Sequence, residues 1–501
     1  MFPIKLKILL SYLVYVVILL SCEFDDKPSE PIVNKPFDGQ SIMLIVPKVH
    51  ADIITGPVVE YAKLFKQKTG GEIRIIFPGF NDTIDIIKQS LTDENLHFDV
   101  FVVLSMWSGH LFSGNYIEAI PAEIKTKIQW HDVLPIYKNN ILSWNSIAYG
   151  FPLDGDSINL FYRKDIFEKK SIKNKFFKIY GYELSPPKTW QQYRQVAEFF
   201  TGWDWDGDGL KEYGNAVYRV KGDTSTLHFI AQAATYTKHP DDKAYYFDVN
   251  TMKPRINNPG FVKALEEYVQ LLDYGPKAMI NFVNNDLRNS FVTGEVVMAI
   301  DWGNLGTYAV NSSLSIVKNK VGYAQIPYSN TVYNSKAKQW DERINPVSSI
   351  SGNWMMLVNK ESKNKDLALA FCAFMTSAES TQELIADGSS GVNPSRFSHF
   401  EDEKALSKSG FSQQSARSYL DEISISLNYS NVVFDINIPG ASEYYEALDL
   451  YIYQAAVKLL KPQEALDQVA IKWQEITNNL GRDKQIQYYK ASLNMKAEQI
   501  N

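Results

Sequence analysis

Short β-rich runs alternate with amphipathic helical segments from residue 41 onward, and this alternation limits the fold more than any other feature of the chain. Residues 41–46, 72–77 and 99–104 are rich in Ile, Val and Phe, as is typical of buried strands. Between them, residues 58–65 and 84–91 carry apolar side chains at helical spacing. This β-α-β-α-β order predicts an α/β fold with a mainly parallel sheet, whose ligand sites lie beyond the carboxyl ends of the strands.

A second set of strands and helices begins near residue 147, where Pro152 interrupts a strand. The expected features, in chain order, are renewed β-rich alternation over residues 157–163, the N-caps Thr189 and Asn258 before two helices, and buried strands over residues 294–302 and 353–358. The remainder of the chain is predicted to be helical. With 501 residues, the chain is long enough for roughly two or three domains.

The N-terminus carries the pattern of an export signal. Lys5 and Lys7 precede an apolar run over residues 8–21 that is too short to span a bilayer but suits a secretory signal. The run ends Leu-Leu-Ser-Cys, which resembles a bacterial lipobox, and Cys22 is then the residue that receives a diacylglycerol. We expect residues 1–21 to be a lipoprotein signal peptide and the exported protein to be lipid-anchored to the cell membrane, facing the periplasm or the exterior. A plain signal peptide with an incidental cysteine is the alternative.

Residues 22–40 are polar, acidic and spaced by proline, which predicts an extended, lipidated tether. The other cysteine, Cys372, lies in an apolar helical pattern and is expected to be an inert core residue. Two cysteines so far apart form neither a disulfide framework nor a metal cluster.

The charge balance argues against nucleic acid as a partner. The chain has 51 Lys and Arg against 57 Asp and Glu, a formal net charge of −6, and no long basic run. Binding to phosphate backbones needs clustered Lys and Arg that displace counterions. We therefore expect no nucleic-acid partner, and we expect a monomer.

Four stretches resemble the extracellular solute-binding proteins of family 1, the carbohydrate-type receptors of ABC importers that include maltose-binding protein. They are residues 57–65 with 99–107 (DVFVVLSMW), residues 151–167 (FPLDGDSINLFYRKDIF) with 187–190, residues 291–304 (FVTGEVVMAIDWGN), and residues 351–375 with 388–400 (GSSGVNPSRFSHF). They follow one another in order and together span most of the mature chain.

The resemblance implies a type II periplasmic-binding-protein fold: two α/β lobes joined by hinge strands, with a helical C-terminal region. The N-terminal lobe would comprise residues 41–152 and 303–349, and the C-terminal lobe residues 153–302 and 350–501. The implied function is to capture a small carbohydrate, a sugar or oligosaccharide, in the cleft between the lobes. The receptor would then deliver it to ABC permease subunits that are served by a separate ATPase.

Aromatic and polar side chains at the implied cleft positions are candidate ligand contacts, because sugars stack their C–H faces on rings and offer hydroxyls to Asp, Asn and Arg. The candidates are Trp107, Asp154, Asp156, Asp301, Trp302, Asn353, Trp354 and Arg396. We place Trp302 and Trp354 first, with Phe80 and Asn81 as weaker candidates. For each aromatic residue, a place in the core of a lobe is the alternative.

Residues 204–215, DWDGDGLKEYGN, match the first half of an EF-hand calcium loop. The expected ligands are Asp204, Asp206, Asp208, the Leu210 carbonyl and Glu212, at positions one, three, five, seven and nine. Asn215 stands where the full motif has a bidentate Glu, so Glu212 would have to coordinate directly. Some solute-binding proteins, including alginate-binding ones, carry a similar shortened loop. This resemblance favours a structural Ca²⁺ over a solvated acidic turn.

Two other classes of protein remain open. A secreted glycoside-active enzyme needs two carboxylates that flank the scissile bond, and Asp154 and Asp301 could meet across a cleft. A lipoprotein that senses a ligand without transporting it is the other. The sequence contains no GxSxG, HExxH or P-loop motif, and its seven histidines are scattered. We therefore expect a receptor rather than an enzyme, without an organic cofactor.

Overall fold

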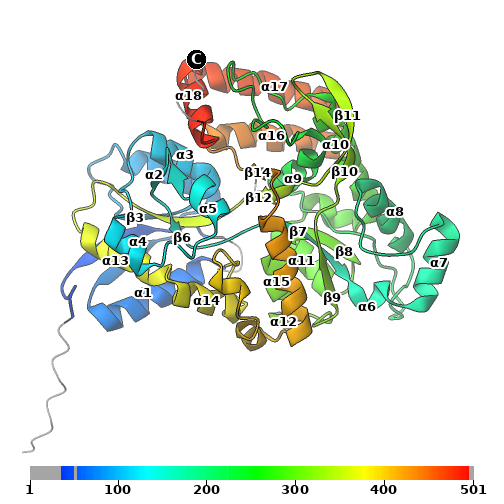
Figure 1. Cartoon of the computed structure of the whole chain (residues 1–501), viewed down its shortest axis with the longest axis horizontal. Helices are drawn as coiled ribbons and strands as arrows, with labels where there is room; N and C mark the ends of the chain where they lie inside the picture. Colours follow the sequence, from blue (N-terminus) through cyan, green and yellow to red (C-terminus); the bar gives the residue numbers. More distant parts are fainter. Residues whose placement is uncertain (1–34, 50–52, 223, 496–501) are drawn as a thin grey trace, which may run out of the picture.

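The computed structural model describes residues 35–49, 53–222 and 224–495, which form two α/β lobes and a helical C-terminal region (Figure 1). The first lobe is built on a five-stranded sheet in the order β2-β1-β3-β13-β6. Its strands are β1 (Ser41–Ile45), β2 (Glu72–Ile76), β3 (Val100–Leu104), β6 (Phe151–Pro152) and β13 (Trp354–Val358). The expected signal peptide, residues 1–21, and Cys22 lie outside the described residues.

The first three strands are parallel, as the β-α-β-α-β pattern predicted: β1 pairs with β2 on one side and with β3 on the other. β13 then joins the sheet in the antiparallel sense, with Met356 opposite Val102 of β3 and opposite Phe151 of β6. All five residues of β13 are buried, so this apolar strand needs a partner strand on each side.

The position of β13 corrects the expected division of the chain. Residues 350–501 were assigned to the C-terminal lobe, but β13 and the helix α13 that follows it belong to the first lobe, where α13 packs on α1 and β1. The reason is the backbone pairing of β13 with β3, which is 250 residues earlier in the chain at the Trp354–Leu104 pair.

The second lobe contains a three-stranded antiparallel sheet in the order β8-β7-β9. Its strands are β7 (Ile158–Arg163), β8 (Met298–Trp302) and β9 (Val321–Ala324). Because β9 pairs with β7, the assignment of residues 303–349 to the N-terminal lobe is wrong. The same region adds a hairpin, β10 (Ser329–Asn334) with β11 (Gln339–Asn345), that packs on helices of the second lobe.

The chain passes between the lobes at residues 153–157, at residues 351–353 and again between α14 and α15. Beside the second passage, β12 (Ser348–Ile350) pairs in parallel with β14 (Val432–Phe434). Figure 1 shows this pair lying between the two lobes. A short hairpin, β4 (Ser143–Trp144) with β5 (Ile147–Ala148), precedes the first passage.

Helices cover both sheets and form the C-terminal region, where α16 packs against α17, α9 and also α3 of the first lobe. The helices are α1 (Thr55–Thr69), α2 (Phe80–Ser90), α3 (Ser105–Ser113), α4 (Ala122–Lys127), α5 (Pro135–Asn140), α6 (Lys164–Phe167), α7 (Lys170–Tyr180), α8 (Trp190–Phe200), α9 (Thr226–Thr237), α10 (Pro259–Gln270), α11 (Asn284–Val292), α12 (Asn304–Asn311), α13 (Lys365–Met375), α14 (Ala378–Asp387), α15 (Gln413–Leu427), α16 (Ala441–Ala456), α17 (Pro462–Asn479) and α18 (Arg482–Ser492).

Local sequence signals set several of these boundaries. The Thr189 hydroxyl accepts from the Gln192 backbone N–H at 3.2 Å, and the Gln192 side chain accepts from the Thr189 N–H, which completes a capping box at the start of α8. The Asn258 side chain accepts from two backbone N–H groups at the start of α10. Both predicted N-caps are therefore confirmed.

The segment just before β1 corrects the expected tether, which ran over residues 22–40. Residues 35–40 form a turn that is attached to the first lobe: the Phe37 N–H donates to the Thr69 carbonyl at 2.9 Å, and the Phe37 ring stacks on Phe65. Burial of the Phe37 ring holds this part of the segment on the lobe. The rest of the expected tether, residues 22–34, lies outside the described residues.

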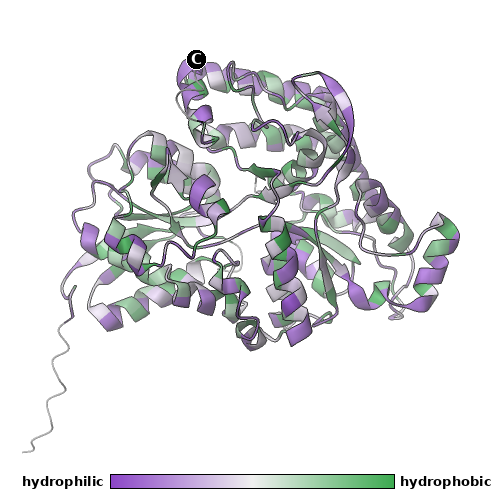
Figure 2. Cartoon of the chain, viewed as in Figure 1, coloured by the Kyte–Doolittle hydropathy of each residue, from purple (hydrophilic) through white to green (hydrophobic). Residues whose placement is uncertain are grey.

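The apolar residues gather in the sheets and on the helix faces that cover them (Figure 2). Cys372 is fully buried in α13 and is a free thiol, as expected for a core residue. The largest fully buried side chain is Trp473 of α17, whose indole N–H donates to the Tyr444 carbonyl of α16. Within the described residues, no helix combines the length and the apolar character needed to cross a membrane.

The capping box of α8 gives a first prediction. Thr189→Ala removes the acceptor of the Gln192 N–H and should lower the free energy of unfolding by about 1 kcal/mol. Thr189→Ser keeps the hydroxyl and should stay close to the unchanged protein. Urea unfolding followed by circular dichroism measures both. Equal losses for the two variants would show that the hydroxyl contributes nothing.

Candidate ligand-binding cleft

A cavity of about 620 Å³ opens between the two lobes, within the range of roughly 300–1,000 Å³ that small-molecule sites occupy. Both lobes and the segments that connect them supply its wall. The lining residues are Lys48, Val49, Ile53, Gly79, Phe80, Asn81, Leu104, Asp156, Tyr218, Val220, Lys221, Gly222, Thr224, Val283, Asn284, Asn285, Arg288, Trp302, Asn304, Gly352, Trp354 and Gly391.

Two tryptophans from different lobes line this cavity, Trp302 at the end of β8 and Trp354 at the start of β13. The Trp302 indole N–H donates to the Ser351 carbonyl at 2.9 Å, which fixes the ring. Gly352 lies beside it with a φ of 80°, and a Cβ at Gly352 would come within 3.1 Å of the Trp302 indole nitrogen. Only glycine fits both the left-handed backbone and the close approach.

His228 of α9 supports the Trp302 ring from behind, with their ring centroids 4.8 Å apart. Burial lowers the pKa of His228 to about 4, so the imidazole is neutral at physiological pH. The cavity wall at Trp302 is therefore an uncharged aromatic surface.

A fixed polar group lies next to Trp302 on α11 and α12. Arg288 donates through Nε to Asp301 at 2.6 Å and through a terminal nitrogen to the Asn304 side chain at 2.6 Å. Asn284 donates to the other oxygen of Asp301 at 3.0 Å. Asp301 itself is fully buried and does not line the cavity. Arg288 and Asn284, which donate to Asp301, do line it, and so does Asn304, which accepts from Arg288. Its role in this geometry is to orient them.

Asp154 and Asp156 lie on the first passage between the lobes, and only Asp156 lines the cavity. Asn393 joins them: its backbone N–H donates to Asp154 at 2.7 Å and its side-chain amide to Asp156 at 2.5 Å. Burial raises the pKa of Asp154 to about 6. Burial and the charge of the neighbouring Asp154 raise the pKa of Asp156 well above its usual range.

Trp107, expected in the cleft, does not line the main cavity. It lies in α3, is almost fully buried and contacts the Phe80 ring, with centroids 5.1 Å apart. Phe80 and Asn81, the weaker candidates, lie at the start of α2 and do line the cavity.

Asn353 and Arg396 are also placed away from the cavity wall. The Asn353 carbonyl accepts from the Ser105 N–H at 2.8 Å, and its side chain is buried. Arg396 is completely buried, and its guanidinium donates to the backbone carbonyls of Ile128 and Thr376 at 3.0 and 2.6 Å. The expectation that Arg396 faces the cleft is wrong, because the NPSR turn inserts it into the first lobe as a cross-link.

Arg288, Asn284 and Asn304 were missed as wall residues. They lie on two helices, one before and one after the DW pair, and the sequence contains no motif that joins them. The only signal was Asp301 itself, a carboxylate on a buried strand that requires a charged partner.

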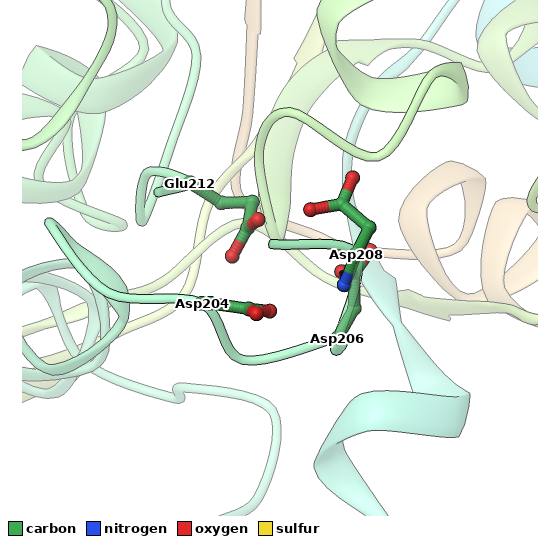
Figure 3. Close-up of side chains that lie close together, drawn as sticks. All are labelled: Asp204, Asp206, Asp208 and Glu212. Carbon is green, nitrogen blue, oxygen red and sulfur yellow. Dashed lines mark hydrogen bonds between the residues drawn. The ribbon is translucent and has the colours of Figure 1, made fainter. Parts of the chain in front are cut away.

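The acidic loop over residues 204–212 brings its carboxylates together. One ligand oxygen from each of Asp204, Asp206, Asp208 and Glu212 lies within 4.8 Å of the others, and Figure 3 shows the four side chains converging. Part of this convergence comes from the turn itself, since Asp204 accepts from the backbone N–H groups of Gly207 and Gly209. Within the described residues, the Leu210 carbonyl accepts no hydrogen bond. Its role as a calcium ligand stays a prediction.

Glu212 is the buried member of this cluster. One of its oxygens accepts from the Trp205 N–H at 3.0 Å, and the other finds no hydrogen-bond partner among the described residues. Burial, and then the charges of Asp206, Asp208 and Asp204, raise the pKa of Glu212. A buried carboxylate oxygen next to three more carboxylates is an arrangement that a divalent cation would stabilise.

The chain belongs to the family of bacterial extracellular solute-binding proteins, whose pattern matches residues 60–406. Among related sequences, a probable ABC transporter-binding protein of Deinococcus radiodurans is 23% identical over 362 residues, 69% of this chain and 74% of that protein. A probable amino-acid ABC transporter periplasmic-binding protein of Sinorhizobium fredii is also 23% identical, over 74% of this chain and 76% of its own length.

Solved structures share the fold. A solute-binding protein of Agrobacterium radiobacter in complex with ribitol superposes with a TM-score of 0.69 at 20% identity, covering 88% of this chain and all of the other. Maltose-bound MalE3 of T. maritima superposes with a TM-score of 0.66 at 19% identity, covering 87% and 99%. The two-lobe fold and the family expected from the sequence are therefore confirmed.

The Arg288–Asp301 pair gives a second prediction. Arg288→Met leaves Asp301 buried without a cationic partner and should lower the free energy of unfolding by about 3 kcal/mol. Arg288→Lys keeps the charge but not the planar fork, so its loss should be smaller. Urea unfolding of both variants measures the difference. Equal losses would show that the charge of Arg288 does not matter to Asp301.

Proposed function

We propose that this protein is the receptor of an ABC importer and captures a sugar or polyol in the cavity between its lobes. The observation that carries the proposal is the composition of that cavity: one tryptophan from each lobe, with a prearranged Arg–Asn group beside them. Aromatic faces accept the C–H faces of sugar rings, and fixed amides accept or donate to hydroxyls.

The ligands of the solved relatives support a polyhydroxylated solute. The superposed proteins were solved with ribitol, D-mannitol, maltose and alpha-D-tagatose. The relative named as an amino-acid receptor suggests a different class. An amino-acid ligand would need a cation for its carboxylate. Arg288 already donates to Asp301 and Asn304, so Lys48 and Lys221 of the cavity wall are the cations that such a ligand would use. The two tryptophans and the ligands of the superposed structures favour the polyol or sugar.

Capture is expected to work through closure of the lobes. Ligand that contacts Trp302 and Trp354 at once binds the closed form better than the open form and shifts the population toward it. The closed form then docks on the permease, and a separate ATPase supplies the energy of transport.

Turnover of the ligand is not part of the proposal. The two carboxylates considered as a glycosidase pair, Asp154 and Asp301, are both buried outside the cavity wall and bonded to neighbouring groups. Neither is placed to protonate a leaving group or to attack a sugar carbon.

We also propose that acylation of Cys22 anchors the exported protein to the membrane, on the strength of the lipobox-like end of the signal sequence. Anchoring keeps the receptor near its permease. The test is metabolic labelling with a radiolabelled fatty acid: Cys22→Ser should abolish the label and release the protein from the membrane fraction.

Binding is tested by thermal unfolding of a chain that begins at Glu23, against a panel of monosaccharides, oligosaccharides, polyols, uronates and amino acids. Ligand at about 100 times its Kd should stabilise the native state by about 2.7 kcal/mol, a shift of several degrees. Trp302→Ala should abolish the shift, whereas Trp340→Ala, a half-exposed tryptophan outside the cavity, should retain it. A response confined to amino acids would contradict the proposal.

We further propose that the loop of Asp204, Asp206, Asp208 and Glu212 binds a structural Ca²⁺, since these side chains offer the hard oxygen ligands that this cation takes. The ion would neutralise the repulsion among the carboxylates and hold the loop to the second lobe. The buried, unpartnered oxygen of Glu212 is the observation that separates this loop from a solvated acidic turn.

Calcium should therefore raise the melting temperature of the protein, and EDTA should reverse the rise. Glu212→Gln and Asp204→Asn should each remove most of the calcium response, because each deletes a charged ligand. Glu183→Gln, an exposed acidic residue outside the loop, should leave it intact. The same melting temperature with calcium and with EDTA would contradict the calcium site.

A further inference from the structure

A second chamber of about 430 Å³ lies beside the main cavity. Phe80 and Asn81 of the first lobe and Gly222 and Thr224 of the second lobe line both spaces and form the neck between them. The two chambers therefore adjoin along these four residues. A ligand long enough to pass this neck would contact both chambers.

The inner wall of the second chamber is aromatic and apolar. Trp107 and Met106 of α3 form one side, and Leu227 of α9 and Tyr445 of α16 form the other. The Tyr445 hydroxyl accepts from the Ile436 N–H at 3.0 Å, so its ring is held in place. Trp107, expected to contact ligand but absent from the main cavity, thus lines the cleft after all, one chamber further along.

The outer edge of the second chamber is acidic. Asp85 of α2 and Glu443 and Glu446 of α16 surround it, with Lys88 as the cation among them, 3.5 Å from Asp85 and 3.6 Å from Glu443. Glu446 forms no ion pair within the described part of the chain, and it lies on the same helix face as Glu443. The edge carries more negative than positive charge.

We propose that this chamber is a second sugar subsite of the cleft, so that the preferred ligand is an oligosaccharide built of neutral or amino sugars. The inference rests on the proposed carbohydrate function and deepens it. The ring of Trp107 would receive the second unit as Trp302 and Trp354 receive the first. Carboxylates accept hydrogen bonds from hydroxyl and ammonium groups, and they repel a uronate carboxylate at distances below the Debye length of about 8 Å.

The two chambers carry different charges on their walls, and this difference decides which chamber better accepts an acidic sugar unit. Lys48 and Lys221 lie on the wall of the main cavity, whereas Asp85, Glu443 and Glu446 lie on the second chamber. A uronate unit is therefore tolerated better in the main cavity than in the second chamber. An oligomer with acidic units throughout would place one of them against the acidic edge.

The test is isothermal titration calorimetry of the purified mature protein with glucose and with di- and trisaccharides of the malto, cello and xylo series. Chitosan trimer and trigalacturonate complete the panel. We expect the best trisaccharide to bind at least about tenfold more tightly than its own monosaccharide, a difference of about 1.4 kcal/mol. Trigalacturonate should bind more weakly than the neutral trimers.

Ser442→Trp fills the second chamber from α16 without touching the main cavity. It should remove most of the trisaccharide advantage, while the affinity for the monosaccharide changes by less than about twofold. Gln454→Trp adds the same side chain to the same helix away from both chambers and serves as the matched control. Glu446→Lys should raise the affinity for trigalacturonate relative to the neutral trimer.

The outcomes separate the subsite from the proposed function. A monosaccharide or polyol that binds as tightly as any oligomer, or a trisaccharide advantage that survives Ser442→Trp, overturns the subsite and leaves the receptor function standing. Binding of no sugar at all, with a folded protein, overturns both. A preference for trigalacturonate overturns the assignment of neutral or amino sugars.

Discussion

The antiparallel insertion of β13 between β3 and β6 is the constraint from which the position of the cleft follows. An apolar strand that is buried throughout needs hydrogen-bond partners on both sides, and β13 finds them in β3 and β6 of the first lobe. Since β13 runs against the parallel strands, its first residue lies at their carboxyl end. Trp354 thus stands opposite Leu104, and both line the cavity. This is the edge where open α/β sheets bind their ligands.

The approach to β13 from the second lobe then brings the two tryptophans to one site. The chain reaches β13 through Gly352, whose left-handed backbone turns it from one lobe to the other, and Trp302 of the second lobe packs against that turn. The same glycine serves the turn and the close contact. The wall of the cleft is therefore assembled by the passage between the lobes rather than by either lobe alone.

Much of the fold was predictable because its signals are local. Alternation of strands and helices predicted the parallel part of the first sheet, and Thr189 and Asn258 predicted two helix starts. The allocation of later segments to lobes was not predictable, because β13 and β9 each pair with a strand far away in sequence. Periodicity identifies a buried strand but not its partner.

The site was predictable only in part, for a reason that Asp301 and Trp302 illustrate. Neighbouring residues of a strand point to opposite faces. Trp302 therefore faces the cavity while Asp301 points into the lobe and holds Arg288. The adjacent DW pair could not reveal which member faces ligand. The prediction that Arg396 faces the cleft was wrong for a similar reason. An arginine in a turn can also be buried and donate to backbone carbonyls.

Buried carboxyl groups connect the passages between the lobes to one another. Asp154 on the first passage accepts from the Asn393 N–H near the third, and Asp435 accepts from the Gly352 N–H on the second and from the Ser105 hydroxyl. Burial raises the pKa of both Asp154 and Asp435 to about 6, because the charged form loses its hydration there. These bonds tie the passages to one another. In the proposed closure the lobes would rotate about the passages, and the rotation would bring Trp302 and Trp354 onto the ligand from opposite lobes.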